Sequence, residues 1–341
     1  MKKLNFVDKL LFVVNSVFAA LLILSYFLPF IPPHLSPLLA VLSLAVPFLI
    51  LSNLVFFLFW LLKLKRQLLL SFLVLLIGFN HVNSLFKILS SKTLNEQNQL
   101  SIMNYNVRLF NLYSWIDDDH VELDIIKFIK KQSPDVISFQ EYHPHVNVNL
   151  SSYKFKYEKL SGNRVKYGQA IFSKYPIISS GSIEFANTAN NAIYVDIVKA
   201  SDTVRVYNIH LQSLRLDTKK EELTKDNSSR LLRRIGETFK IQETQTELFL
   251  KHKNASPHKM IICGDFNNTA YSYVYKKIKE NLKDSFNEAG HGFGRTWNFK
   301  YFPIRIDFIL VDNSFKVNTF EVFNQNYSDH FPIISKMSLG Q

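Results

Sequence analysis

Three long apolar stretches occupy the first 90 residues of the chain, and they constrain its fold more than any other feature. A helix needs about 20 apolar residues to cross the hydrocarbon core of a bilayer. The stretches at about 10–31 and 38–62 meet this requirement, and the third, at about 68–89, does so with polar residues in its second half. We therefore expect residues 1–92 to form a membrane region with three transmembrane helices.

The basic residues around these stretches predict an orientation. Basic flanks stay in the cytoplasm, so the N-terminus and the link between the second and third stretches are expected inside. The chain that follows the third span is then extracytoplasmic, and it becomes cytoplasmic if the third stretch only lies on the membrane. Lys87 and Lys92 count against this orientation, and the basic flanks that support it are Lys2, Lys3, Lys9, Lys63, Lys65 and Arg66.

Two features of the membrane region have alternatives. The first stretch follows two lysines, as a cleaved signal peptide would, but it is too long for one and further apolar stretches follow. Asn80, His81 and Asn83 could form a site within the membrane. Their position near the predicted outer end favours an ordinary helix end at the interface.

The charge of the chain is concentrated in the membrane region. The net charge is +12, but residues 1–92 contain eight of the 40 basic residues and only one of the 28 acidic residues. The remaining 32 basic and 27 acidic side chains give the rest of the chain only +5, which is weak evidence for a nucleic-acid surface. Cys263 is the only cysteine, so an intrachain disulfide is excluded.

After a polar linker at 93–100, residues 101–341 have the pattern of a separate domain. Short strands predominate, and few helices lie between them, which favours a mixed α+β sandwich over a Rossmann-type sheet. Helices are expected at 117–131 and 228–252. Strands are expected at 101–107, 136–140, 170–173, 192–198, 203–211, 260–263, 305–311 and 333–337.

The most informative motif is GDFN, which follows the apolar run 260–263. A strand that ends in Asp265 and Asn267 places a carboxylate and an amide on the same edge of a sheet. The carboxylate can take a proton from water, and the amide can hold a phosphate oxygen. The alternative is that both residues only cap a turn.

Further polar residues lie in or beside the other apolar strands, where an unpaired charge is costly. They occupy six separate segments, and the complete set is Asn106, Glu141, His210, Asp265, Asn267, Asp307, Asp329 and His330. This set, with GDFN upstream of a closing SDH, resembles the endonuclease/exonuclease/phosphatase superfamily, which has the DNase I-like fold. The resemblance covers about 101–339 and implies a four-layer sandwich of two mixed sheets flanked by helices.

The residue types predict roles that agree with the resemblance. Glu141, Asn106 and Asp329 offer hard oxygen ligands for Mg²⁺ or Mn²⁺. Asp265 would deprotonate the attacking water, and Asn267 would orient it or bind a phosphate oxygen. His330, paired with Asp307, would stabilise the charge that develops on phosphorus. His210 would bind a second phosphate oxygen or assist the leaving group.

Four features are weaker. Arg305 lies two residues before Asp307, so it would share that strand face and could contact phosphate; the alternative is a rim position. Arg108 stands where abasic-site endonucleases of the superfamily carry an acid, and this difference argues against abasic DNA as the substrate. Tyr142 and His143 could line the cleft or belong to an ordinary loop, and the charged segment 215–234 is best explained as a solvated helix face.

Together these patterns predict a membrane-anchored, divalent-metal-dependent phosphoesterase that uses an Asp-activated water. The substrate would be a lipid headgroup, a nucleic acid or an inositol phosphate. The alternatives are an extracytoplasmic nuclease acting on DNA or RNA, a sphingomyelinase-like lipid phosphodiesterase, and a non-catalytic membrane-binding module. The non-catalytic module is disfavoured because the carboxylates of a catalytic site are all present, namely Glu141, Asp265, Asp307 and Asp329.

Overall fold

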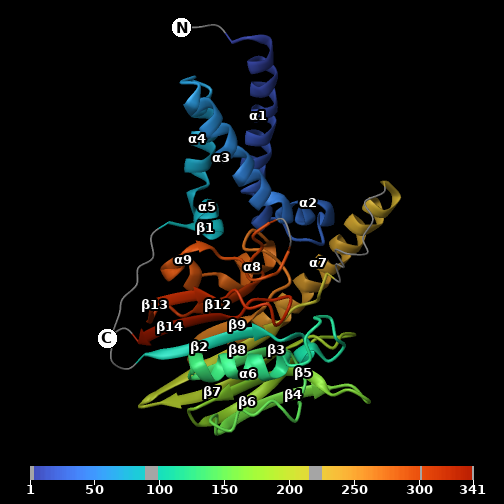
Figure 1. Cartoon of the computed structure of the whole chain (residues 1–341), viewed down its shortest axis with the longest axis vertical. Helices are drawn as coiled ribbons and strands as arrows, with labels where there is room; N and C mark the ends of the chain where they lie inside the picture. Colours follow the sequence, from blue (N-terminus) through green and yellow to red (C-terminus); the bar gives the residue numbers. More distant parts are fainter. Residues whose placement is uncertain (1–3, 89–98, 215–224, 300–301, 340–341) are drawn as a thin grey trace.

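The computed structural model describes residues 4–88, 99–214, 225–299 and 302–339. Helices over 6–85 stand against a larger α/β domain, which we call the sandwich domain (Figure 1). Residues 93–98 of the predicted linker, and 215–224 of the charged segment, lie outside the described residues.

Two six-stranded sheets form the centre of the sandwich domain. Each sheet is mixed, because β2 runs parallel to β3 in one and β8 runs parallel to β9 in the other. The first sheet has the order β10 (Lys283–Asp284), β12 (Asp307–Val311), β9 (Lys259–Asp265), β8 (Asp202–His210), β7 (Asn191–Lys199) and β6 (Ile177–Glu184). The second has the order β13 (Phe315–Val322), β14 (Ile333–Leu339), β2 (Leu100–Asn106), β3 (Val136–Tyr142), β5 (Tyr167–Ser173) and β4 (Phe155–Ser161).

The inward-facing residues of both sheets form one apolar core, which includes Ile102 and Val136 from the second sheet and Val206 and Ile261 from the first. Helix α6 (Val121–Gln132) covers the outer face of the second sheet. Helices α7 (Lys225–Asn254) and α8 (Tyr273–Lys279) cover the outer face of the first. The predicted four-layer sandwich is therefore confirmed (Figure 1).

Two of the N-terminal helical segments, Phe6–Phe30 and Pro37–Leu62, are long and apolar enough to cross a membrane. The third predicted span is not a single helix, because α4 and α5 meet at an angle of 81°. The break falls at Gly78, where a Cβ would lie 2.0 Å from the hydroxyl of Tyr26. The elements are α1 (Phe6–Ser25), η1 (Leu28–Phe30), α2 (Pro37–Leu42), η2 (Ser43–Ala45), α3 (Val46–Leu62), α4 (Leu68–Ile77) and α5 (Phe79–Leu85).

Buried polar side chains join these helices. The Asn15 amide of α1 donates to the hydroxyl of Ser71 on α4 at 2.7 Å and accepts from the indole of Trp60 on α3 at 2.9 Å. Ser71 in turn donates to Asn53 of α3 at 3.3 Å. Interhelical hydrogen bonds of this kind stabilise helix packing in an apolar environment, so α1, α3 and α4 form one bundle.

The near end of the bundle packs on the sandwich domain. Tyr271 lies in an apolar cluster with Leu28 and Leu85, and its hydroxyl donates to the carbonyl of His81 at 3.2 Å. The strand β1 (Phe86–Lys87) pairs with β11 (Gly292–Phe293). In Figure 1, α1, α3 and α4 extend away from the sandwich, while α2 and α5 lie beside it.

Candidate active site

The polar strand ends meet at one edge of the two sheets. Asp265 ends β9, and the strand pairing places it beside His210 of β8 on one side and Asp307 of β12 on the other. Asn106 ends β2 in the opposite sheet, and its amide nitrogen donates to the Oδ2 atom of Asp265 at 3.1 Å. The sequence-predicted residues of the two sheets are therefore in direct contact.

The local backbone of GDFN fixes the position of its carboxylate. Gly264 has a φ of +152°, and a Cβ there would lie 2.0 Å from the carbonyl oxygen of Ile209 on the adjacent strand. Only glycine fits such an approach. Asp265 is 1% exposed, and its Oδ1 atom accepts the backbone N–H of Asn267 at 2.8 Å. Asn267 is itself in the left-handed region, with a φ of +49°.

His330 lies between two buried carboxylates. Its Nδ1 atom is 2.9 Å from Oδ2 of Asp307, and its Nε2 atom is 3.6 Å from Oδ2 of Asp265. Burial alone would lower the pKa of His330, but the two carboxylates raise it well above the ordinary value. The two carboxylates therefore favour the protonated imidazole, which can donate to an anion.

The pKa values of Asp265 and His210 are shifted in opposite directions. Burial raises the pKa of Asp265 to about 6, although His330 and His210 act against this shift. Burial lowers the pKa of His210, whose Nε2 atom is 3.8 Å from Asp265. That nitrogen is buried and has no hydrogen-bond partner among the described residues. A buried polar atom without a partner marks a place where a ligand can bind.

Glu141, Asn106 and Asp329 form a second group of oxygen-bearing side chains. Burial and the neighbouring Asp329 raise the pKa of Glu141, which has no ion-pair partner within the described ranges. Such a carboxylate, with a second acid nearby, fits a hard divalent cation. The Asn106 amide turns its nitrogen towards Glu141, at 3.5 Å, so it would contribute a ligand only through its oxygen atom.

Asp265, Asp307 and His330 also place ligand atoms within 4.8 Å of one another, so they too could hold a metal ion. The hydrogen bond between His330 and Asp307 already engages Nδ1 of His330 and Oδ2 of Asp307, two of the atoms that a metal would need. Glu141 therefore remains the better candidate for the metal.

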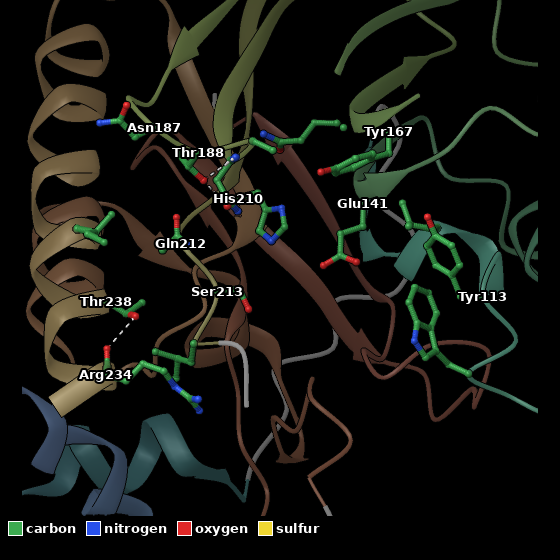
Figure 2. Close-up of a pocket in the computed structure, with 18 residues that line it drawn as sticks. Tyr113, Glu141, Tyr167, Asn187, Thr188, His210, Gln212, Ser213, Arg234 and Thr238 are labelled. Atoms are coloured by element: carbon green, nitrogen blue, oxygen red, sulfur yellow. Dashed lines mark hydrogen bonds between the residues drawn. The ribbon is translucent and has the colours of Figure 1, made fainter. Parts of the chain in front are cut away.

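Two cavities meet at Glu141. One, of about 820 Å³, lies between this residue, His210 and α7; in Figure 2, Glu141 and His210 point towards one another from opposite sides of it. The other, of about 640 Å³, contains most of the predicted site residues. We call this second space the membrane-side cavity, because Leu44, Ala45, Pro47 and Phe48 of the N-terminal helices form part of its wall.

The structure does not bring Arg305 into the site. It precedes β12, which begins at Asp307, so the alternation of a strand does not apply to it. Its buried guanidinium pairs with Asp284 at 2.7 Å, donates to the carbonyl of Ser84 at 3.3 Å and stacks on Phe286. The predicted phosphate contact is therefore replaced by a structural ion pair.

Arg108 lies in the cleft instead. Its guanidinium is 3.4 Å from Asp329 and 4.4 Å from the ring centroid of Trp115, and the residue lines the membrane-side cavity. Tyr142 packs in the core and His143 binds the carbonyl of Lys166 at 2.6 Å, so both have ordinary structural contacts.

Sequence reasoning missed the segment before Arg305, to which Thr296, Trp297, Phe299 and Phe302 belong. The hydroxyl of Thr296 accepts the backbone N–H of Asp307 at 3.0 Å, and Trp297 forms a β-bridge with His330. Trp297, Phe299 and Phe302 line the membrane-side cavity. The signal for this segment was its density of aromatic residues, WNFKYF.

The chain belongs to the Endonuclease/Exonuclease/phosphatase family, whose sequence profile matches residues 103–330. Membership of this family supports a hydrolase that acts on phosphate esters. Residues 8–85 match a second profile, described as a domain of unknown function (DUF8431). No curated protein matches the chain.

Solved structures share the fold at low sequence identity. An endonuclease/exonuclease/phosphatase from Bacteroides vulgatus is 17% identical with a TM-score of 0.55, covering 71% of this chain and 100% of that one. The human Nocturnin catalytic domain with bound sulfate is 16% identical with a TM-score of 0.54, covering 71% and 94%. A mannosyl-6-phosphatase from Bacteroides thetaiotaomicron is 16% identical with a TM-score of 0.51, covering 70% and 100%.

Proposed function

We propose that this chain is a membrane-anchored, divalent-metal-dependent phosphoesterase in which Asp265 activates the attacking water. The observation that carries the proposal is the position of Asp265 between two imidazoles, 3.6 Å from His330 and 3.8 Å from His210, with Glu141 lining the same cavities. The pKa of His330 is raised and that of His210 is lowered. Paired groups whose pKa values are pushed apart are typical of acid–base sites.

Each side chain suits a separate part of an in-line attack on phosphorus. Asp265, with a pKa of about 6, is ionised at neutral pH and remains basic enough to take a proton from water. His330 would donate to a non-bridging phosphate oxygen as charge develops on it. The unpartnered Nε2 atom of His210 would bind a second oxygen or the leaving group. Asn267 would position the water or the phosphate.

Glu141, with Asp329 and the oxygen of Asn106, would hold Mg²⁺ or Mn²⁺. When bound, the metal supplies positive charge that neutralises the phosphate and lowers the pKa of a coordinated water. Arg108 lies beside Asp329 and would add to the positive charge around the phosphate.

The N-terminal helices would anchor the chain in a bilayer. They would cross it three times if the bent pair α4–α5 forms one span. The link 63–67 and the N-terminal end of α1 lie at the end of the bundle away from the sandwich domain (Figure 1). Because basic residues flank that end, including Lys63, Lys65 and Arg66, the positive-inside rule supports an extracytoplasmic sandwich domain.

A nuclease is the second candidate. Tyr113 and Trp115 line the larger cavity and are 59% and 41% exposed, so bases could stack on them. Against this candidate, the chain after residue 92 is only mildly basic.

Turnover of matched substrates tests the proposal. The full-length protein in detergent would be assayed side by side with DNA, sphingomyelin, inositol phosphates and a sugar 6-phosphate, each with Mg²⁺, with Mn²⁺ and with a chelator. We expect metal-dependent hydrolysis of at least one phosphate ester. Hydrolysis that continues undiminished in the chelator would contradict the metal requirement.

A further inference from the structure

The membrane-side cavity is lined by two chemically different sets of residues. The polar set includes Arg108, Ser213 and the five residues that the proposed function places around the phosphate, which are Glu141, Asp265, Asn267, Asp329 and His330. The rest of the wall is almost wholly apolar. It is formed by Leu44, Ala45, Pro47, Phe48, Leu214, Trp297, Phe299, Phe302, Ile304 and Ile306.

The apolar wall is built jointly by the bundle and the sandwich domain. Phe48 of α3 and Phe302 meet edge to face, with ring centroids 6.0 Å apart. The hydroxyl of Thr269, close in sequence to GDFN, donates to the carbonyl of Ser43 at 3.5 Å. The bundle and the sandwich domain therefore share this wall, which lines the same cavity as Asp265.

An apolar stripe on α3 continues from this wall towards the far end of the bundle. Phe48, Leu51, Val55, Leu58 and Leu62 recur at steps of three and four residues, so they share one face of the helix. Phe48, Val55, Leu58 and Leu62 are exposed to 44%, 64%, 46% and 86%, and Leu51 is half-buried. In a bilayer this face would contact lipid along its whole length and reach the cavity at Phe48.

We propose that the substrate is a phosphate ester carried by a membrane lipid, with its hydrocarbon chain lying along the apolar wall at Phe48 and its phosphate among the polar lining residues. The inference rests on the proposed function and adds the substrate class. A water-soluble ester would contact the polar residues alone and leave the apolar wall in contact with water. A hydrocarbon chain on that wall would stabilise binding by about 25 cal/mol for each Å² of apolar surface removed from water.

The exposed positive charge near the bundle agrees with a lipid surface. Helix α7 packs against α2, where Gly236 lies close to Pro37. Its first described turns carry the exposed residues Arg230 and Arg233. Basic side chains at a membrane surface attract anionic headgroups, so α7 would help to hold the sandwich domain at the bilayer.

A comparison of lipid and headgroup substrates tests this inference. The full-length protein in nanodiscs would be assayed with dioleoyl phosphatidic acid and dioleoyl phosphatidylglycerol. The water-soluble counterparts glycerol 3-phosphate and glycerophosphoglycerol would be assayed beside them. We expect kcat/KM for one of the lipids to exceed that of its own soluble counterpart by at least 100-fold.

Two variants locate the effect in the apolar wall. Phe48→Ala removes the ring that the bundle contributes to this wall, and Phe302→Ala removes the ring that it contacts in the sandwich domain. Each should reduce the lipid-to-soluble ratio of kcat/KM by about 10-fold, the scale set by a change in a hydrophobic pocket. The matched control is Phe72→Ala on α4. Phe72 is 43% exposed, almost as much as Phe48, but does not line the cavity, so the ratio should stay unchanged.

The outcomes separate the two proposals. Efficient hydrolysis of the soluble esters without a preference for the lipids, or equal loss on both in the two wall variants, would overturn the lipid inference and leave the phosphoesterase intact. Absence of any hydrolysis, with all four esters and with the wider panel described above, would overturn both.

Discussion

The Nδ1 atom of His330 lies 2.9 Å from the Oδ2 atom of Asp307, and both side chains are almost completely buried. A carboxylate at this distance fixes the orientation of the ring and favours its protonated form. The other ring nitrogen, Nε2, faces Asp265. The pair therefore holds a positive charge beside the residue that we propose as the base.

Replacement of Asp307 by Asn should lower the pKa of His330, because it removes the largest influence that raises this pKa. The active form carries the proton, so activity is lost as pH rises through the pKa of His330. We expect the alkaline limb of the kcat/KM profile to move to lower pH and the maximum rate to fall about 10²-fold. An equal loss at every pH, with no movement of that limb, would show that Asp307 only supports the fold.

Gly264→Ala should destabilise the protein, because its Cβ would overlap the backbone oxygen of Ile209. Backbone atoms of two paired strands cannot move apart locally, so we expect a cost of about 2–4 kcal/mol, measured by thermal unfolding. Gly292→Ala is the matched control. Gly292 also has a positive φ, +65°, but nothing lies within 4 Å of its added Cβ, so about 1 kcal/mol is expected.

Arg305→Met should affect stability rather than chemistry. It leaves the buried Asp284 without its guanidinium partner, and the loss of one member of a buried ion pair costs about 3–5 kcal/mol. Per folded molecule, kcat/KM should stay within about threefold of the wild type. Arg233→Met, at an exposed position, should change the unfolding free energy by less than about 0.5 kcal/mol. If activity disappeared while the melting temperature held, Arg305 would belong to the site after all.

The proposed orientation can be measured by labelling single cysteines. The native Cys263 is fully buried and should not react with a membrane-impermeant maleimide. Glu237→Cys places a thiol on the exposed side of α7, and Leu64→Cys places one in the link at the far end of the bundle, where Leu64 is 87% exposed. In intact cells we expect the Glu237→Cys variant to be labelled. The Leu64→Cys variant should be protected until the membrane is permeabilised. The reverse pattern would place the sandwich domain in the cytoplasm.

Sequence reasoning worked where local chemistry decides the structure. Strands that end in a charged or amide side chain bring these groups to one sheet edge, and the structure places Asn106, Glu141, His210 and Asp265 together there. It failed where tertiary contacts decide. The bend at Gly78 depends on the packing of Tyr26 from another helix.

Arg305 illustrates a second kind of limit. Its spacing from Asp307 predicted a shared strand face, but β12 begins only at Asp307 and the preceding backbone is irregular. The membrane-side cavity also could not be predicted, because its wall joins Phe48 to Phe302 across more than 250 positions of sequence. No local pattern indicates that two such residues meet.

The most direct test of the central claim is the rate of metal-dependent phosphate-ester hydrolysis by Asp265→Asn. The exchange keeps the size of the side chain and removes its ability to accept a proton from water, so we expect kcat to fall by about 10³-fold or more. Asp202→Asn, at a surface ion pair with Lys259, should keep the wild-type rate. Wild-type turnover by Asp265→Asn would contradict the account, because the proposed base would then be dispensable.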